Sequence, residues 1–420
     1  MSLVSKRWRC LCNSVPVIDL CELYSGQNFR RKFPEILNDC MIHRRRDKIE
    51  GKGTGLSRLK LGMFSSSTSS ARLNGWLIIW AQSKLEELDL CIETGIPKNY
   101  YMLPPSVLSM TSLTIMKLYG VSLEGLVSVN LPSLTCLSLK NVRMDDQMLH
   151  KLLMGCCSLE KLLLKDCVDL FNPIISNSSL KSFEFVNGLC QTILQVEAKN
   201  LQSFTYDGGP STYGEFNLPF CGTIRNLSLS NMLMNDGWLE DIIVRIPLLE
   251  SLSLCNFTQL EHVEICSQHL KHLVFRGDRC CSGVENIVDT PNLVSFIFEG
   301  HLLSEFSMIK RRPNVLNADI KLFSPHAYDT RWYFNLLDFL ANFDCSNTLN
   351  LKVYTEEALI FPDKFRKRCY TPLPTLKHMK VILINCLILN KSNLRDTLLW
   401  ISPSLETLLI EQKLDIVTID

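Results

Sequence analysis

The sequence lacks any apolar run long enough to cross a membrane. Its longest apolar stretches, residues 76–81 and 381–389, are far shorter than the roughly 20 residues that a spanning helix needs. The first residues also lack the apolar core of a secretory signal, because Lys6, Arg7 and Arg9 interrupt them. We therefore expect a protein of the cytoplasm, the nucleus or both, without a membrane partner.

An excess of charge of either sign is missing too. The 44 Lys and Arg residues nearly balance the 43 Asp and Glu residues, which gives a formal net charge of +1. Such a chain has no overall field that attracts nucleic acid or an anionic lipid surface. The sequence thus predicts no nucleic-acid partner, and any partner must be chosen by local features of the surface.

Cysteine is common, but its usual functional spacings are absent. The 18 cysteines are spread along the chain, and no Cys-x-x-Cys pair occurs among them. In a reducing compartment such residues are mostly small buried hydrophobes. The adjacent pairs Cys156/Cys157 and Cys280/Cys281 are poorly placed for a bridge, because neighbouring cysteines rarely form an unstrained disulfide.

Fingerprints of catalysis are also missing. The chain has no phosphate-binding glycine loop, no Gly-x-Ser-x-Gly, no His-Glu-x-x-His and no dinucleotide-binding glycine pattern. His262, Cys266, His269 and His272 are close in sequence, but zinc sites usually show tighter paired spacing. Arg44–Arg46 is interpreted as a solvated helix end rather than a nucleic-acid patch. We expect no enzyme activity, no metal and no cofactor.

The sequence does contain a repeat. The pattern Leu-x-x-Leu-x-Leu, with other apolar residues allowed at its apolar positions, recurs eleven times at intervals of 21 to 29 residues. This spacing is the period of leucine-rich repeats. The matches begin at Leu56, Leu85, Leu113, Leu134, Leu159, Leu180, Leu201, Ile224, Leu249, Leu270 and Leu293.

The alternating apolar positions of each match predict a short strand with one buried face. One such strand cannot bury its face alone, so successive coils must stack and join their strands into a parallel sheet. The predicted fold is therefore an α/β leucine-rich-repeat solenoid, with a parallel concave sheet and a convex side of mixed helices and strands.

The segments that return between strands differ in kind. Apolar residues at helical spacing predict a helix capped by Asp145 and another capped by Asn235 or Asp236. Segments 193–198 and 260–265 are too short for a helix and predict a second strand on the back of the coil.

From about residue 300 the repeat becomes irregular. An amphipathic helix carrying Trp332 and Leu336 precedes the strand-like segment 349–353, and the pattern returns at Leu376 and Leu405. We expect the solenoid to continue there with longer coils.

Several parts of the chain resemble a known family. Residues 3–20, with the runs Ser5–Trp8 and Ser14–Pro16, resemble the last helix and the exit strand of the F-box in plant F-box/LRR proteins. Residues 76–90 resemble the segment by which that family enters its repeats, and residues 131–167 resemble its most recognisable repeat pair.

The resemblance implies a partner for each end of the molecule. In that family the F-box docks on the Skp-type adaptor of a cullin–RING ubiquitin ligase, and the repeats hold the protein to be ubiquitinated. The resemblance therefore implies an adaptor-binding stripe of Val4, Trp8 and Leu11, and a Skp-type adaptor and cullin as partners. Because the Leu-Pro-rich first half of an F-box does not occur before this helix, we expect an N-terminally truncated F-box.

The predicted organisation is a partial, helical F-box remnant at 1–24, a helical connector at 25–55, leucine-rich repeats at 56–300 and irregular leucine-rich repeats at 301–420.

The solvent-facing side of the strands is the predicted binding surface. In each motif the third and fifth positions, and the residue after the sixth, point away from the buried leucines. Their mixture of acidic, basic, polar and apolar side chains suits a protein partner better than a phosphate backbone. The predicted partner-binding residues are Glu87, Asp89, Lys117, Tyr119, Lys161, Lys165, Glu184, His272, Arg276 and Glu299.

Together these observations predict the substrate-recognition subunit of an SCF-type (cullin–RING) E3 ubiquitin ligase that binds an unknown target protein through its concave face. The alternative is a stand-alone leucine-rich-repeat scaffold that has lost adaptor docking. A small-molecule sensor is a third hypothesis, and it requires a basic or aromatic-lined pocket on the concave face.

Overall fold

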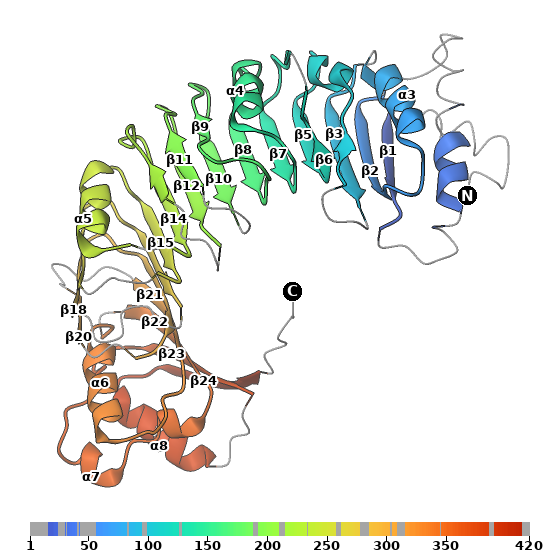
Figure 1. Cartoon of the computed structure of the whole chain (residues 1–420). Coiled ribbons are helices and arrows are strands. Elements are labelled where there is room, and N and C mark those ends of the chain that lie inside the picture. Colours follow the sequence, from blue (N-terminus) through green and yellow to red (C-terminus); the bar gives the residue numbers. More distant parts are fainter. Residues whose placement is uncertain are drawn as a thin grey trace. The chain divides into compact units, whose positions relative to one another are not determined.

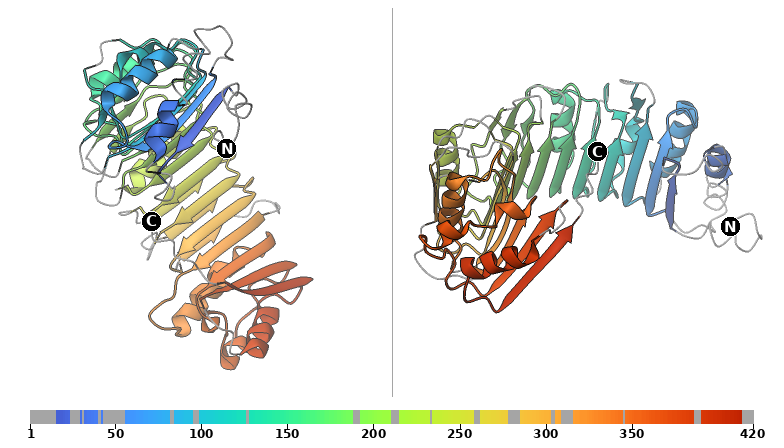
Figure 2. Two further views of the ribbon diagram at one scale, coloured as in Figure 1. Left: turned by 90° about the vertical axis from the view of Figure 1, so that its right-hand side faces the viewer. Right: turned by 90° about the horizontal axis from the view of Figure 1, so that it is seen from below.

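The chain forms two compact units, Met1–Cys221 and Gly222–Asp420, each with its own run of parallel strands (Figures 1 and 2). The computed structural model describes residues 16–23, 30, 32–39, 42, 56–81, 84–94, 99–125, 128–187, 192–209, 215–232, 234–257, 262–277, 285–302, 305–308, 316–344, 346–385 and 390–413.

The first unit is built on a parallel sheet in which each strand pairs in register with the strand of the next coil. In spatial order the strands are β1 (Val17–Cys21), β2 (Arg58–Phe64), β3 (Glu87–Glu93), β5 (Ile115–Tyr119), β7 (Cys136–Lys140), β8 (Lys161–Lys165), β10 (Ser182–Val186) and β12 (Ser203–Asp207). Strand β1, which lies in the segment predicted as the F-box remnant, pairs with the first repeat strand.

The second unit repeats this plan with longer strands toward its end. Its parallel sheet contains β14 (Asn226–Ser230), β15 (Ser251–Cys255), β17 (His272–Arg276), β19 (Ser295–Gly300), β21 (Leu316–Leu322), β22 (Ser346–Val353), β23 (His378–Ile384) and β24 (Thr407–Lys413). The pairing of β19 with β21 runs through residue 300, where the sequence pattern becomes irregular.

Every one of the eleven motif matches lies at a strand, and each strand begins at the third position of its motif. Strand β3, for example, begins at Glu87, two residues after Leu85. The apolar residues at the fourth and sixth positions, such as Leu88 and Leu90, are fully buried. The predicted leucine-rich-repeat solenoid is confirmed, and its core is the stack of these apolar side chains.

In the first unit, helices and short strands lie behind the sheet (Figure 1). The helices there include α3 (Ser70–Ala81), the 3-10 turn η1 (Pro105–Ser109) and α4 (Asp146–Met154). The predicted cap of α4 is confirmed, because the Asp145 carboxylate accepts a hydrogen bond from the Met148 N–H at 2.7 Å. Small parallel sheets join β4 (Tyr101–Met102) to β6 (Val121–Ser122), and β9 (Ile174–Ile175) to β11 (Ile193–Val196) and β13 (Glu215–Asn217).

The second unit has the same mixture behind its sheet. Helix α5 (Asp236–Arg245) is capped by Asn235, one of the two predicted caps, and α6 (Thr330–Ala341) is the predicted amphipathic helix, capped by Asp329. The predicted second strands at 193–198 and 260–265 are present as β11 in the first unit and as β16 (His262–Cys266) in this one. Strand β16 pairs with β18 (Glu285–Asp289), and β18 pairs with β20 (Glu305–Met308).

The last coils contain helices that the sequence pattern did not predict. One of them is the one-turn helix α7 (Asp363–Arg366), which follows the 3-10 turn η2 (Glu356–Ala358). Helix α8 (Lys391–Ile401) was not predicted at all, although it buries Leu394 and Leu398. None of the helices in the described ranges is both long and apolar enough to cross a bilayer.

Candidate functional site on the strand face

The solvent-facing side of each sheet, called the strand face below, is made of three rows of side chains. The rows come from the third and fifth positions of each motif and from the residue after the sixth. Because neighbouring strands pair in register, residues at the same motif position stand side by side, about 4.8 Å apart across the sheet. Tyr119, Lys140 and Lys165, for example, are successive members of one row.

All ten predicted partner-binding residues lie on a strand face, and all are at least partly exposed. The structure divides them between the two units. Glu87, Asp89, Lys117, Tyr119, Lys161, Lys165 and Glu184 belong to the first unit, and His272, Arg276 and Glu299 belong to the second.

Some of these charges are already neutralised by a neighbouring strand. Glu87 pairs with the Arg58 guanidinium at 2.5 Å, and this hydrogen bond raises the pKa of Arg58. Glu299 lies between two cations, with its carboxylate 3.8 Å from Arg276 and 3.0 Å from Lys321. Burial alone would lower the pKa of Lys321, but the hydrogen bonds with Glu299 and Tyr354 raise it.

Later coils of the second unit also contain ion pairs between neighbouring strands. Lys352 pairs with Asp319 at 2.7 Å, and Lys380 pairs with Glu411 at 2.9 Å. The charges of this strand face are therefore largely satisfied between adjacent strands.

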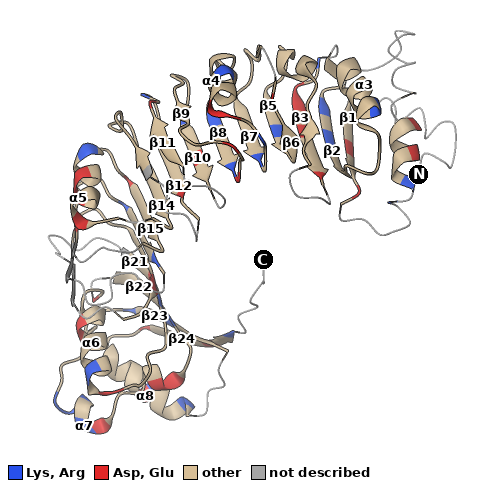
Figure 3. Ribbon diagram, viewed as in Figure 1, with Lys and Arg blue, Asp and Glu red and all other residues tan. Residues whose placement is uncertain are grey.

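The strand face of the first unit is different over β5, β7 and β8 (Figure 3). Lys117, Lys140, Lys161 and Lys165 project from these strands and are exposed. Among the described residues none of the four ammonium groups forms an ion pair. Together with the half-buried Ile115, Tyr119 and Leu163 between them, they are called the lysine surface below.

Register sets two of these lysines directly opposite each other. Lys140 on β7 pairs with Lys165 on β8, and like charges in that position destabilise a sheet. Lys140 is not among the predicted binding residues. It follows the motif that begins at Leu134, so the rule that selected Tyr119 and Lys165 also selects Lys140.

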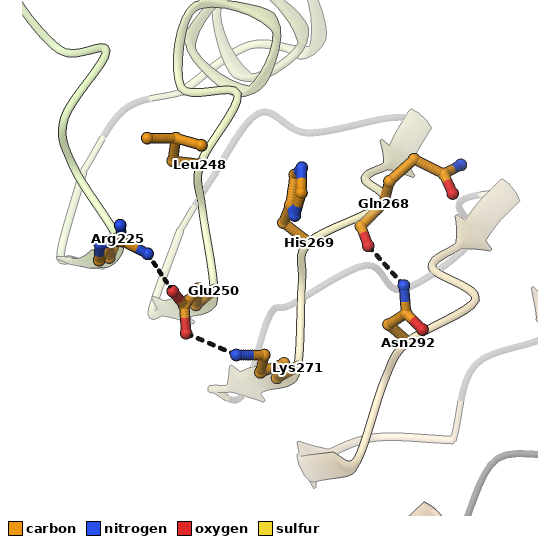
Figure 4. A pocket seen from close by; sticks show the side chains of 7 residues that line it. All are labelled: Arg225, Leu248, Glu250, Gln268, His269, Lys271 and Asn292. Carbon is orange, nitrogen blue, oxygen red and sulfur yellow. Dashed lines mark hydrogen bonds and ion pairs between the residues drawn. The ribbon is translucent and has the colours of Figure 1, made fainter.

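The pocket in Figure 4 lies at the amino ends of strands in the second unit. Its floor is an ion triad in which the Glu250 carboxylate binds Arg225 and, at 2.8 Å, Lys271. Asn292 donates to the Gln268 carbonyl at 2.7 Å, and Leu248 and His269 complete the lining. The hydrogen bonds from Lys271 and Arg225 lower the pKa of Glu250.

The pocket is too small for most organic ligands. Its volume is about 120 Å³, and sites for small molecules usually measure roughly 300–1,000 Å³. Its charged groups, Arg225, Glu250 and Lys271, already bind one another, so we interpret this triad as a structural link between coils.

The residues weighed as metal ligands are not brought to one point. Cys266 belongs to β16 behind the sheet, whereas His272 begins β17 on the strand face. Among the described side chains, no group of three or more His, Cys, Asp and Glu residues could hold a metal ion.

The predicted adaptor-binding stripe of Val4, Trp8 and Leu11 lies outside the described residues, as does Arg44–Arg46. Nearby, residues 32–39 are helical and bury Phe33 and Leu37. The buried Glu22 carboxylate, just after β1, accepts a hydrogen bond from the Phe64 N–H at 2.7 Å and so links β1 to β2.

Comparison with known proteins identifies the family of the repeats. The family model of the leucine-rich repeats of FBD-associated F-box protein At5g56370 matches residues 73–213 and 215–319, which is more than half of the chain. Residues 3–20, which carried the predicted F-box match, lie outside both ranges.

Similar curated proteins come from Arabidopsis thaliana. F-box/LRR-repeat protein At3g59190 is 30% identical over 223 residues, covering 51% of this chain and 55% of that protein. F-box/FBD/LRR-repeat protein At5g56420 is 27% identical over 40% of this chain and 38% of its own length. Putative FBD-associated F-box protein At5g22720 is 24% identical over 64% of this chain and 50% of its own length.

The chain thus spans about half or less of the length of these relatives. The family model covers the coils from β3 to β19, which include the three strands of the lysine surface, but not β1 and β2 or β22 to β24. These matches and the solenoid fold agree with the resemblance found in the sequence, and the chain belongs to the family of plant F-box/LRR-repeat proteins.

Proposed function

We propose that the chain is the substrate-recognition subunit of an SCF-type (cullin–RING) E3 ubiquitin ligase. Membership of the F-box/LRR-repeat family supports this role most strongly. In the proposed complex the N-terminal segment binds a Skp-type adaptor linked to cullin. The strand face binds the target protein, and the chain itself performs no chemistry. The cytoplasm and the nucleus, where we expect the chain, are compartments in which such a complex works.

The exposed strand face supports the second half of this proposal. The repeats bury their apolar side chains and leave rows of charged and polar groups in solvent, on strands that hold their spacing rigidly. Binding groups on a rigid framework lose little entropy when a partner binds.

The adaptor half is tested with the full 420-residue chain and a purified Skp-type adaptor. We expect saturable binding in interferometry and co-elution in size-exclusion chromatography. Trp8→Ala should abolish this binding, because Trp8 is central to the predicted adaptor stripe. Tyr370→Ala is the matched control, since the Tyr370 side chain is 96% exposed and far along the chain.

A different result would favour the scaffold alternative. If the chain does not bind the adaptor, and binds only after a complete F-box is fused to its N-terminus, the ligase role of this chain is wrong. The strand face would then belong to a protein-interaction module without adaptor docking.

A further inference from the structure

On three adjacent strands of the first unit, every charged side chain of the strand face is basic. Among the nine solvent-facing positions of β5, β7 and β8 there are four lysines and neither Asp nor Glu. These positions are Ile115, Lys117, Tyr119, Cys136, Ser138, Lys140, Lys161, Leu163 and Lys165.

The positive charge of this lysine surface is not neutralised by the described residues. None of its four lysines forms an ion pair there, although Lys321, Lys352 and Lys380 on the other strand face all do. Lys140 and Lys165 also stand opposite each other, and an anionic ligand would relieve the repulsion between their ammonium groups. A partner that brings negative charge is therefore complementary to this surface.

The size of the surface suits a short extended segment. Three strands span about 10 Å across the sheet, and Lys161 and Lys165 are about 13 Å apart along β8. An extended chain of about four to six residues covers that area.

Apart from Ser138, the side chains between the lysines are largely apolar. Leu163 has Lys161 and Lys165 on either side along β8, and Ile115 and Tyr119 flank Lys117 along β5. A ligand that carries only charge would leave these groups in contact with water. A segment that alternates acidic and apolar residues would satisfy both kinds of group.

The borders of the surface disfavour nucleic acid. Asp89 stands opposite Lys117 on one side, and Glu184 stands opposite Leu163 on the other. A polynucleotide continuing across the sheet would meet these carboxylates. The three strands also carry no arginine, the residue best suited to bind a phosphate through two hydrogen bonds.

We infer that the lysine surface binds an acidic and partly apolar segment of a partner protein through the carboxylates of its Asp and Glu residues. This inference rests on the proposed function in one respect, because it names the substrate class of that recognition subunit.

The test measures binding of a fluorescent peptide pool to the full chain by anisotropy at low and at physiological salt. The peptides have Glu or Asp at alternate positions and randomised apolar residues between them. A pool with Gln and Asn in place of Glu and Asp, and a single-stranded oligonucleotide, are the comparison ligands. The test variant is Lys140→Glu/Lys165→Glu. The control variant is Lys84→Glu/Lys151→Glu, which makes the same change of charge at exposed lysines off the strand face.

We expect the chain to bind the acidic pool, with salt weakening the interaction and the neutral pool binding poorly. Lys140→Glu/Lys165→Glu should weaken binding about tenfold or more, and Lys84→Glu/Lys151→Glu should change it little. Circular dichroism should show both variants folded, because all four lysines are exposed.

Three results would overturn the inference: no binding of the acidic pool, equal loss in both variants, or tighter binding of the oligonucleotide. Adaptor binding by the same variants separates this inference from the proposed function. A chain that binds the acidic pool but no adaptor would contradict only the ligase role, and a chain that binds the adaptor but not the pool would contradict only the substrate class.

Discussion

Several strands end at a residue in the left-handed backbone conformation. Asn141, Asp166, Asn231 and Asn256 have φ values between 48° and 52° and each directly follows a strand. Gly120 takes this position after β5, with φ 70°. Asn, Asp and Gly tolerate this conformation, so in these coils the single residue after the strand determines where the chain leaves the sheet.

Gly120 is the position where this requirement is strictest. A Cβ added there would lie 1.9 Å from the Ile92 carbonyl oxygen, which belongs to the backbone and cannot easily move away. We expect Gly120→Ala to destabilise the protein by about 2–4 kcal/mol, because strain of the left-handed backbone adds to the clash. Urea unfolding followed by circular dichroism measures this change.

Gly75→Ala in α3 is the matched control, since a Cβ there meets nothing within 4 Å. It should stabilise the protein by about 0.5–1 kcal/mol, because Ala favours a helix more than Gly does. Equal effects of the two substitutions would contradict the role assigned to Gly120.

The adjacent thiols Cys156 and Cys157 are expected to differ sharply in reactivity. Burial raises the pKa of Cys156 to about 12, whereas the Cys157 side chain is exposed. At neutral pH a maleimide should therefore label Cys157 and leave Cys156 unmodified in the native protein, because the thiolate is the reactive form. Peptide mass spectrometry distinguishes the sites, and both should react in denaturant. Rapid native labelling of Cys156 would show that the core of this coil is open.

At the scale of helices and strands, α4 shows how one return segment is attached to its neighbours. Asp145 caps the helix, and the next residue, Asp146, accepts hydrogen bonds from the N–H groups of Phe171 at 3.2 Å and Asn172 at 2.9 Å. Two adjacent carboxylates thus begin the helix and hold the return segment of the following coil.

Removing the cap should cost a measurable part of the stability of α4. We expect Asp145→Ala to lower the free energy of unfolding by about 1 kcal/mol, and Asp145→Asn to cost much less, because asparagine also caps helices well. Thermal unfolding by calorimetry provides the comparison. If the two variants were equally unstable, the negative charge rather than the hydrogen bond to Met148 would be the important feature.

The sequence was sufficient to predict a strand or a helix cap wherever the residues of a single coil show the pattern that is typical of it. The strands followed from the paired apolar positions of the motif, and the caps of α4 and α5 followed from Asp145 and Asn235 before apolar helical patterns. The cap of α6 by Asp329 was not predicted. Strand β21 was harder to predict, because Ala318 occupies the buried position that a large apolar residue, such as Phe296 in β19, fills in neighbouring coils. Helix α8 was missed although its buried residues recur at helical spacing.

The candidate site was predictable only in part. Motif position alone identifies the residues of the strand face, and it also identifies Lys140. It does not show that Arg276 and Glu299 neutralise each other while Lys140 and Lys165 lack an acidic partner. That difference depends on which side chains reach across neighbouring strands, and therefore on the folded coils.

At the scale of the whole molecule, each coil contacts chiefly the coils beside it. The sheets pair β2 with β3 and β3 with β5, and the same order continues through each unit. Stability in such an array is close to a sum of coil and interface contributions. Damage to one coil should therefore remain local.

Leu90→Ala tests this locality. Leu90 is fully buried in β3, so we expect a loss of about 2–5 kcal/mol in the surrounding coils. Hydrogen exchange should accelerate in β2, β3 and β5 and remain unchanged in β22 and β23 of the second unit. Ser138→Ala on the strand face is the control and should leave all strands protected. Uniform acceleration in Leu90→Ala would mean that the two units unfold as one.

The left-handed residues also allow the length of a return segment to change independently of the spacing of side chains on the strand face. Tyr119, Lys140 and Lys165 are each followed at once by the residue at which the chain leaves the sheet: Gly120, Asn141 and Asp166. A return segment can therefore gain or lose residues without altering the spacing of the side chains before it, and the repeat intervals do vary from 21 to 29 residues. Insertions should accumulate on the far side of the coils, while the recognition surface changes only by substitution, one side chain at a time.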